Sequence, residues 1–232
     1  MNTYGQYCPV AKGSEIIADR WTPLILRELL ADIHRFSDLQ RGLPGISRSL
    51  LVNRLRRLEA AGVLERRPGP GGRHLEYHLT AAGWALRPVV MELGEWAARW
   101  AFGDPEPAEL KPEVLMGWMT RRVNRELLPD RRIVVRFDLE RTTKRWWWLV
   151  MQPNDISVCR TDPRFDADLL VRAGLDDLYR LWLGRITFGA ARAQNLVQIE
   201  GPSSLVRAFP SWMALSPLAP AVRAGASRSS PA

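Results

Sequence analysis

The chain of 232 residues has few of the side chains from which most catalytic and metal sites are built. It contains two cysteines, Cys8 and Cys159, and three histidines, and their spacing matches neither a disulfide framework nor a set of metal ligands. No Gly-x-Ser-x-Gly or His-Glu-x-x-His motif occurs. The sequence therefore predicts no enzyme, no metal and no cofactor. No apolar run approaches the length that crosses a bilayer, so we expect no membrane insertion.

Positive charge is concentrated in one part of the chain. The formal net charge is +8, and thirty of the thirty-three basic residues are arginine, which a GC-rich genome would also produce. Residues 47–73 hold seven arginines and two glutamates, so the local excess is more informative than the total. This distribution indicates an anionic partner for the segment.

Residues 47–62 have the pattern of a helix with defined ends. Ser47 is a typical N-cap residue and Gly62 a typical C-terminal stop. At helical spacing Leu51, Leu55 and Leu58 lie on one face, which is therefore the buried one.

The opposite face of this helix is small, polar and basic. It carries Ser49, Asn53, Arg56 and Ala60, with Arg57 at its edge. Arginine can bind guanine and asparagine can bind adenine in the major groove of DNA, while other arginines contact phosphates. The alternative is an ordinary solvated helix face.

A hairpin follows this helix. The turn-rich segment 68–73 separates Arg66 and Arg67 from residues 74–79, whose alternating polarity predicts a strand. Helices followed by a basic hairpin form a winged helix, in which Arg73 and His74 would contact phosphates. The glycine-rich run could instead suggest a nucleotide-binding loop, but it lacks the Lys-Ser/Thr of a P-loop and does not open a helix.

The first hundred residues resemble the HxlR family of bacterial, MarR-like winged helix-turn-helix regulators. The resemblance rests on 8–11 (CPVA), 19–22 (DRWT), 24–29 (LILREL), 35–39 (RFSDL), 43–47 (LPGIS) and 77–83 (YHLTAAG). It implies a homodimer that binds double-stranded DNA at an inverted repeat, with half-sites about one helical turn apart. The residues expected to contact DNA are Arg35, Ser37, Ser47, Arg48, Ser49, Asn53, Arg56, Arg57, Arg73 and His74.

Composition divides the rest of the chain. Residues 84–102 predict a helix with a broad apolar face, which in the family resembles a dimer interface and could otherwise pack within its own subunit. We expect a DNA-binding and dimerisation domain at 1–103, a linker at 104–112, a second domain at 113–217 and a disordered tail at 218–232.

The second domain is expected to be α+β with one mixed sheet. Helices are predicted at 113–123, 175–183, 188–194 and 202–209, and strands at 132–139, 145–151, 155–159, 168–173 and 197–201. This order, with the segments 168–173, 177–185 and 197–202, resembles the sterol carrier protein family, whose domains often enclose an apolar tunnel. No ligand motif of that family transfers to single residues.

Tryptophan is abundant in this second domain, which holds six of the ten in the chain. The consecutive Trp146, Trp147 and Trp148 would alternate between the two faces of a strand, so both faces need cover from the core, a partner or a ligand. Ordinary core packing is one interpretation; the other is contact with a hydrophobic small molecule. The candidates for that contact are Trp118, Trp146, Trp148, Tyr179 and Trp182.

These features together predict a cytoplasmic, nucleoid-associated transcription factor of the HxlR type, more plausibly a repressor, whose second domain senses a hydrophobic small molecule. Two alternatives stay open. Cys8 stands where some HxlR-type regulators keep a redox- or electrophile-sensing thiol, although a small helix-opening residue also explains it. The second domain could also be a carrier that sequesters a hydrophobic metabolite.

Overall fold

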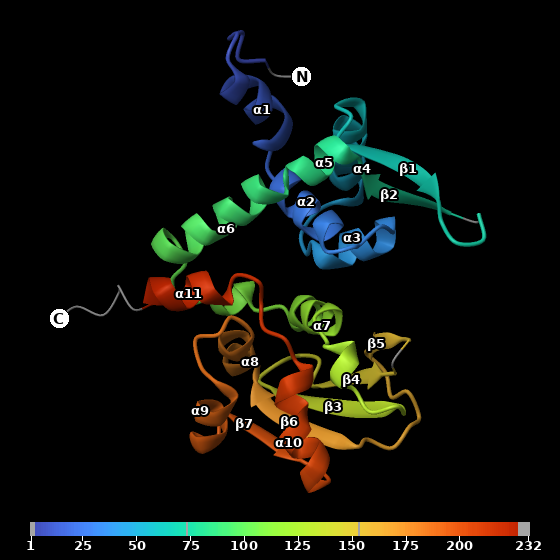
Figure 1. Cartoon of the computed structure of the whole chain (residues 1–232), viewed down its shortest axis with the longest axis vertical. Helices are drawn as coiled ribbons and strands as arrows, with labels where there is room; N and C mark the ends of the chain where they lie inside the picture. Colours follow the sequence, from blue (N-terminus) through green and yellow to red (C-terminus); the bar gives the residue numbers. More distant parts are fainter. Residues whose placement is uncertain (1–2, 73, 153, 227–232) are drawn as a thin grey trace, which may run out of the picture. The chain divides into compact units, whose positions relative to one another are not determined.

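The computed structural model describes residues 3–72, 74–152 and 154–226. The chain folds into two compact units, each held together by contacts among its own residues. The first ends at Gly94 and the second begins at Glu95. The first unit consists of helices and one hairpin (Figure 1). Its elements are α1 (Pro9–Ile17), α2 (Thr22–Leu30), α3 (Phe36–Gly42), α4 (Arg48–Ala60), β1 (Leu64–Pro68), β2 (Leu75–Leu79), α5 (Ala81–Ala85) and the first part of α6 (Arg87–Trp100).

The ends of α4 agree with the prediction from sequence. The Oγ of Ser47 accepts a hydrogen bond from the backbone N–H of Leu50 at 3.2 Å, which caps the helix. Gly62 has a φ of +70°, a backbone conformation that glycine adopts without strain. A single apolar core lies under α2, α3 and α4 and includes Ile25 and Leu29 of α2.

The hairpin is the wing of a winged helix. Strands β1 and β2 pair antiparallel, with Leu64 opposite Leu79 and Pro68 opposite Leu75. Leu64 and Leu79 belong to the core of this unit, while the hairpin projects away from the helices (Figure 1). The predicted winged helix is therefore confirmed.

Residues 84–102, predicted as a single helix, are divided between two helices. Trp84 lies in the short helix α5, and α6 runs from Arg87 to Trp100. The apolar face of α6 is exposed: the exposed fractions of Val89, Leu93 and Trp96 are 46%, 51% and 58%.

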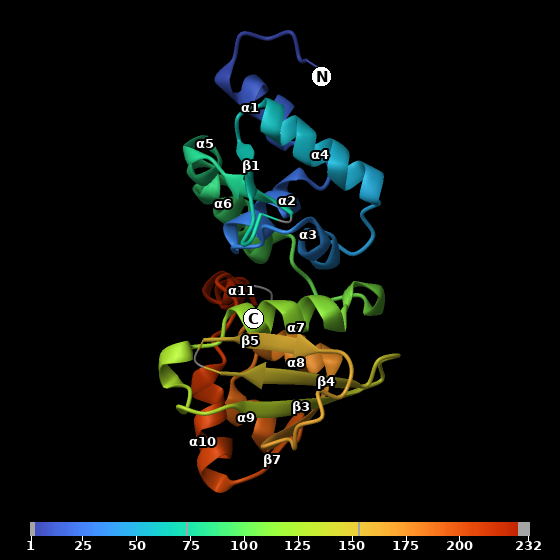
Figure 2. The ribbon, with the colours of Figure 1, turned by 90° about the vertical axis from the view of Figure 1, so that its right-hand side faces the viewer.

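The second unit is built on a mixed sheet with the strand order β5-β4-β3-β6-β7 (Figure 2). Strands β3 and β6 are parallel and the other neighbours antiparallel, so the α+β fold and the mixed sheet are confirmed. After η1 (Pro107–Glu109), the elements are α7 (Pro112–Arg121), η2 (Arg125–Leu127), β3 (Ile133–Glu140), β4 (Trp146–Met151), β5 (Ile156–Cys159), β6 (Leu169–Gly174), α8 (Leu175–Trp182), α9 (Phe188–Ala193), β7 (Val197–Glu200), α10 (Ser203–Trp212) and α11 (Ala219–Ala226).

The three consecutive tryptophans alternate between the faces of β4, as predicted. Trp147 lies opposite Phe137 of β3, and both are buried in the core that the helices α7 to α10 complete. Trp148 belongs to a smaller buried cluster with Val134 and Val150. Alternation along a strand places these two clusters on opposite faces of the sheet.

Two segments differ from the prediction. The expected disordered tail is wrong for 219–226, because these residues form α11, where Ala221 and Val222 are buried. Residues 227–232 lie outside the described residues. The expected linker, 104–112, contains η1 and the first residue of α7. Among the described residues, no helix is both long and apolar enough to span a membrane.

A close backbone approach joins α5 to the start of the wing. The Oγ1 of Thr80 donates to the carbonyl oxygen of Gly62 at 2.6 Å and accepts from the N–H of Gly83 at 3.2 Å. A Cβ atom on Gly83 would lie 2.1 Å from the carbonyl oxygen of Val63, far inside van der Waals contact. Glycine at position 83 is therefore a packing requirement.

We expect Gly83→Ala to lower the free energy of unfolding by about 2–3 kcal/mol, because the backbone around Val63 must move to admit a methyl group. Gly13→Ala is the matched control, since nothing lies within 4 Å of a Cβ built on that residue of α1. The control should be neutral or gain up to about 1 kcal/mol from better helix propensity. Urea unfolding of the three proteins measures this, and equal midpoints for Gly83→Ala and wild type would contradict it.

Candidate nucleic-acid interface

The rotation of α4 about its axis is set by its buried face. Leu51, Leu55 and Leu58 have exposed fractions of 0%, 1% and 1%. They share one core with Ile25 and Leu29 of α2. Because a helix turns 100° per residue, fixing these leucines also fixes which side chains point outward.

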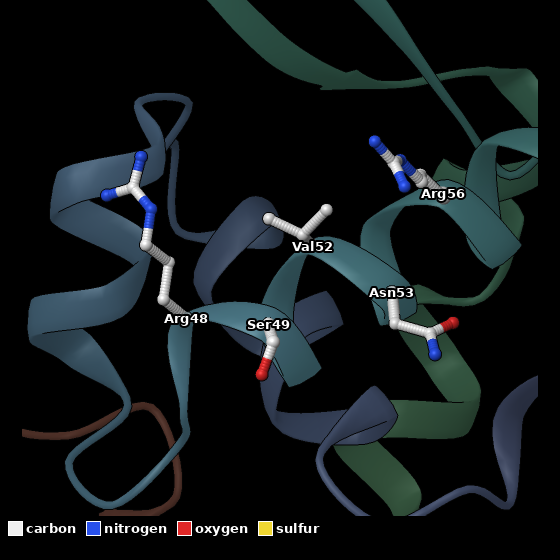
Figure 3. A pocket seen from close by; sticks show the side chains of 5 residues that line it. All are labelled: Arg48, Ser49, Val52, Asn53 and Arg56. Carbon is white, nitrogen blue, oxygen red and sulfur yellow. The ribbon is translucent and has the colours of Figure 1, made fainter.

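The outward face of α4 forms an open hollow. It is lined by Arg48, Ser49, Val52, Asn53 and Arg56, and we call these residues the reading face (Figure 3). Arg48 and Arg56 lie toward the two ends, with the smaller side chains between them (Figure 3). The face combines guanidinium donors, an amide that both donates and accepts, a hydroxyl and two methyl groups. This is the chemistry that distinguishes base edges in the major groove.

The two arginines of the reading face remain available to a ligand. Neither Arg48 nor Arg56 has a carboxylate within 4.0 Å among the described residues. The guanidinium carbon of Arg48 lies 4.9 Å from the ring centroid of Phe36 in α3, a cation–π contact that orients the side chain. Both side chains can therefore take an anionic or base-edge partner without losing an ion pair.

Two neighbouring arginines of α4 are engaged within the unit. Arg54 and Arg57 both pair with Asp19, Arg54 through Nη1 at 3.2 Å. Arg54 also donates to the carbonyl oxygen of Arg20. Arg57, which the sequence places among the DNA-contacting residues, thus joins α4 to the segment before α2.

The remaining predicted contacts lie near α3 and the wing. Ser37 and Ser47 are exposed, and Ser47 serves as the cap of α4. Arg35 and His74 both approach Glu76 Oε1, Arg35 through Nε at 3.5 Å and His74 through Nε2 at 3.1 Å. The hydrogen bond from His74 holds the pKa of Glu76 below its ordinary value. Arg73 lies outside the described residues.

The prediction from sequence omits Val52, because it names only small, polar and basic residues on the outer face of the helix. Positions 49, 52, 53 and 56 follow the i, i+3, i+4, i+7 spacing of one helical face, which already includes Val52. An apolar side chain at this place can contact the methyl group of thymine.

The five aromatic residues predicted to contact a ligand do not meet in one place. Tyr179 and Trp182 of α8 are buried in the main core, and Trp118 of α7 packs edge-on against Tyr179 with ring centroids 6.4 Å apart. Trp148 lies in the cluster on the other face of the sheet, and Trp146 is 52% exposed. Of the five, only the trio Trp118, Tyr179 and Trp182 lies in or against one apolar core.

Cys8 occupies the N-cap position of α1. Its backbone is extended, its side chain makes no capping hydrogen bond, and it is partly exposed. Among the described residues, no three His, Cys, Asp or Glu side chains are arranged to hold a metal ion.

Comparison with known proteins covers the first part of the chain. Residues 16–104 match the HxlR-like helix-turn-helix family. The chain is 38% identical over 97 residues to the uncharacterized HTH-type transcriptional regulator YvaP of Bacillus subtilis (strain 168), a match of 41% of this chain and 90% of YvaP. It is 36% identical over 96 residues to the uncharacterized HTH-type transcriptional regulator YtfH of Escherichia coli (strain K12), a match of 41% of this chain and 76% of YtfH. The solved reduced form of the transcriptional regulator YodB from B. subtilis is 31% identical, with a TM-score of 0.36 over 41% of this chain and 96% of that one.

A winged helix-turn-helix with such relatives defines a DNA-binding transcriptional regulator. The chain belongs to the HxlR-like helix-turn-helix family. The family match ends at residue 104, so it does not extend over the sheet of the second unit.

We expect Arg56→Ala to weaken binding to DNA from the protein's own promoter region by about 1–3 kcal/mol and to relax the preference at one base pair. Arg207→Ala is the matched control, because it removes the same charge from an exposed site on α10. Fluorescence anisotropy with the promoter duplex and single-base variants measures both effects. Unaltered affinity and base preference in Arg56→Ala would show that α4 does not present this face to DNA.

Proposed function

We propose that this protein is a homodimeric transcriptional repressor that binds an inverted-repeat operator and whose second unit binds a hydrophobic small molecule. The observation that carries the DNA-binding part is the reading face of α4. Its two arginines have no carboxylate partner among the described residues, and the core leucines beneath them fix their direction. A protein of this kind works in the bacterial cytoplasm, where its DNA is.

The exposed apolar face of α6 supports the dimer. Val89, Leu93 and Trp96 follow helical spacing and are about half exposed. Val89 and Leu93 also line an apolar cleft with Ile17 of α1 and Leu86. Exposed apolar side chains that gather on one helix face mark a surface that a partner can cover, and a twofold axis lets the same face cover itself.

A dimer presents two recognition helices to one face of DNA. Its operator is then an inverted repeat, with half-sites centred about one helical turn, or about 34–36 Å, apart. Repression requires only that the bound dimer occupies DNA that the polymerase needs. No further protein contact has to be assumed.

The ligand role of the second unit rests on its resemblance to sterol carrier proteins and on the trio Trp118, Tyr179 and Trp182. These aromatic residues of α7 and α8 lie in or against one apolar core. We propose that a hydrophobic molecule held there favours a dimer whose recognition helices no longer match the half-site spacing. The ligand must then bind the two states with different affinities.

We expect an organic extract of the producing cells to lower the affinity of the full chain for its promoter DNA by about fivefold or more. Trp118→Leu should reduce this response, whereas Phe165→Leu, an exposed aromatic residue of the same unit, should not. A ligand that binds tightly without changing the affinity for DNA would instead identify the second unit as a carrier.

A thiol response through Cys8 is the second candidate function, supported by the partly exposed thiol at the N-cap position of α1. On this account diamide lowers the affinity of wild type for promoter DNA. Cys8→Ser abolishes the response and Cys159→Ser keeps it. An equal response in wild type and Cys8→Ser would remove this candidate.

A further inference from the structure

All three histidines of the chain lie on or beside strand β2 of the wing. His74 and His78 flank Glu76 on or next to β2, and His34 belongs to the segment between α2 and α3 that runs beside this strand. The N–H of Tyr77 donates to the carbonyl oxygen of His34 at 2.9 Å, and Arg35 forms a β-bridge with Glu76. The 32–35 segment thus pairs with β2 through its backbone.

The imidazole of His34 reinforces this pairing with both ring nitrogens. Nδ1 lies 3.0 Å from the carbonyl oxygen of Tyr77, and Nε2 lies 2.7 Å from Oδ1 of Asp32. A carbonyl oxygen and an ionised carboxylate can only accept hydrogen bonds. A neutral imidazole carries one N–H and the imidazolium carries two. Both hydrogen bonds can therefore exist together only when His34 is protonated.

Asp32 lies at the C-terminal end of α2. Its φ is +65°, in the left-handed region that non-glycine residues rarely occupy and that aspartate tolerates better than most. The N–H of Ile33 donates to the carbonyl oxygen of Glu28 at 3.1 Å, the hydrogen bond of a Schellman cap, so the end of the helix places Asp32 beside His34.

Aromatic and charged groups surround His34. Its ring stacks on that of His78, with centroids 4.0 Å apart and an interplanar angle of 22°. In the register of the hairpin, Glu65 of β1 lies opposite His78, and Arg67 lies opposite Glu76. The charged or titratable neighbours on this face of the wing are Asp32, Arg35, Glu65, Arg67, His74, Glu76 and His78.

We propose that His34 is a proton-dependent clasp that holds the 32–35 segment against β2 and so fixes the wing for contact with DNA. Histidine side chains ordinarily change charge between about pH 5 and 8. The clasp is complete at the acidic end of this range. As the pH rises and His34 loses a proton, one of its two hydrogen bonds is lost and the wing is held less firmly.

Amide hydrogen exchange of the wild-type full chain tests the clasp without DNA. The protection of the Tyr77 amide, corrected for the intrinsic effect of pH, should be about threefold lower at pH 8 than at pH 6, the size expected for a partly exposed ion pair. The Thr80 amide, which bonds to the carbonyl oxygen of Val63, is the internal control and should show no such loss. Equal protection of Tyr77 at both pH values would overturn the proposal.

The consequence for DNA binding rests on the proposed contact between wing and operator and is measured separately. Wild type should bind promoter DNA more tightly at pH 6 than at pH 8 at constant ionic strength. His34→Gln and Asp32→Asn should each reduce that ratio by about threefold. Asp166→Asn is the matched control for Asp32→Asn, because it removes an exposed carboxylate from the second unit, away from the wing.

The two measurements separate the possible failures. If His34→Gln keeps the full pH response of DNA binding, the clasp does not control the wing and the proposal is wrong. If wild type binds no promoter DNA at any pH, the proposed operator function fails, while the exchange of Tyr77 still decides whether the clasp exists.

Discussion

Leu51, Leu55 and Leu58 lie under α4 in one core with Ile25 and Leu29, and the rest of the DNA-binding unit depends on this contact. Burying each leucine contributes about 1.5–3 kcal/mol, so a helix rotated by one residue would be far less stable. The reading face consists of the residues of α4 that point outward once these leucines are buried. The buried apolar side chains fix the rotation of the helix and thereby the direction in which its polar side chains point.

The wing is anchored in the core by Leu64 and Leu79, and polar contacts hold it further. Thr80 and Gly83 join its base to α5, and the carbonyl oxygen of Val63 leaves no room for a larger residue at position 83. On its outer face, His34 and Glu76 connect β2 to the segment that precedes α3. The direction of α4 is thus fixed by burial, whereas β2 is joined to the segment before α3 by hydrogen bonds and charges.

Local patterns predicted much of this fold because the features concerned are local. The cap at Ser47, the spacing of the leucines and the alternation of the tryptophans of β4 all depend on neighbours in the chain. Contacts between residues that are distant in the chain produce no local sequence pattern from which they could be predicted. The pairing of Arg57 with Asp19 and the approach of His74 and His78 to Glu76 needed the fold itself, as did α11, whose composition resembles that of a tail. The five aromatic residues predicted to contact a ligand share only their residue type. The sheet places Trp148 on the face opposite to Tyr179 and Trp182.

We propose that two copies of this chain bind one operator through their two α4 helices. Hydroxyl-radical footprinting of the promoter fragment, with the mass of the complex determined in the same buffer, tests it most directly. We expect two chains per site and two symmetric protected patches on one face of the DNA, centred about one helical turn apart. A single protected patch bound by one chain would contradict it.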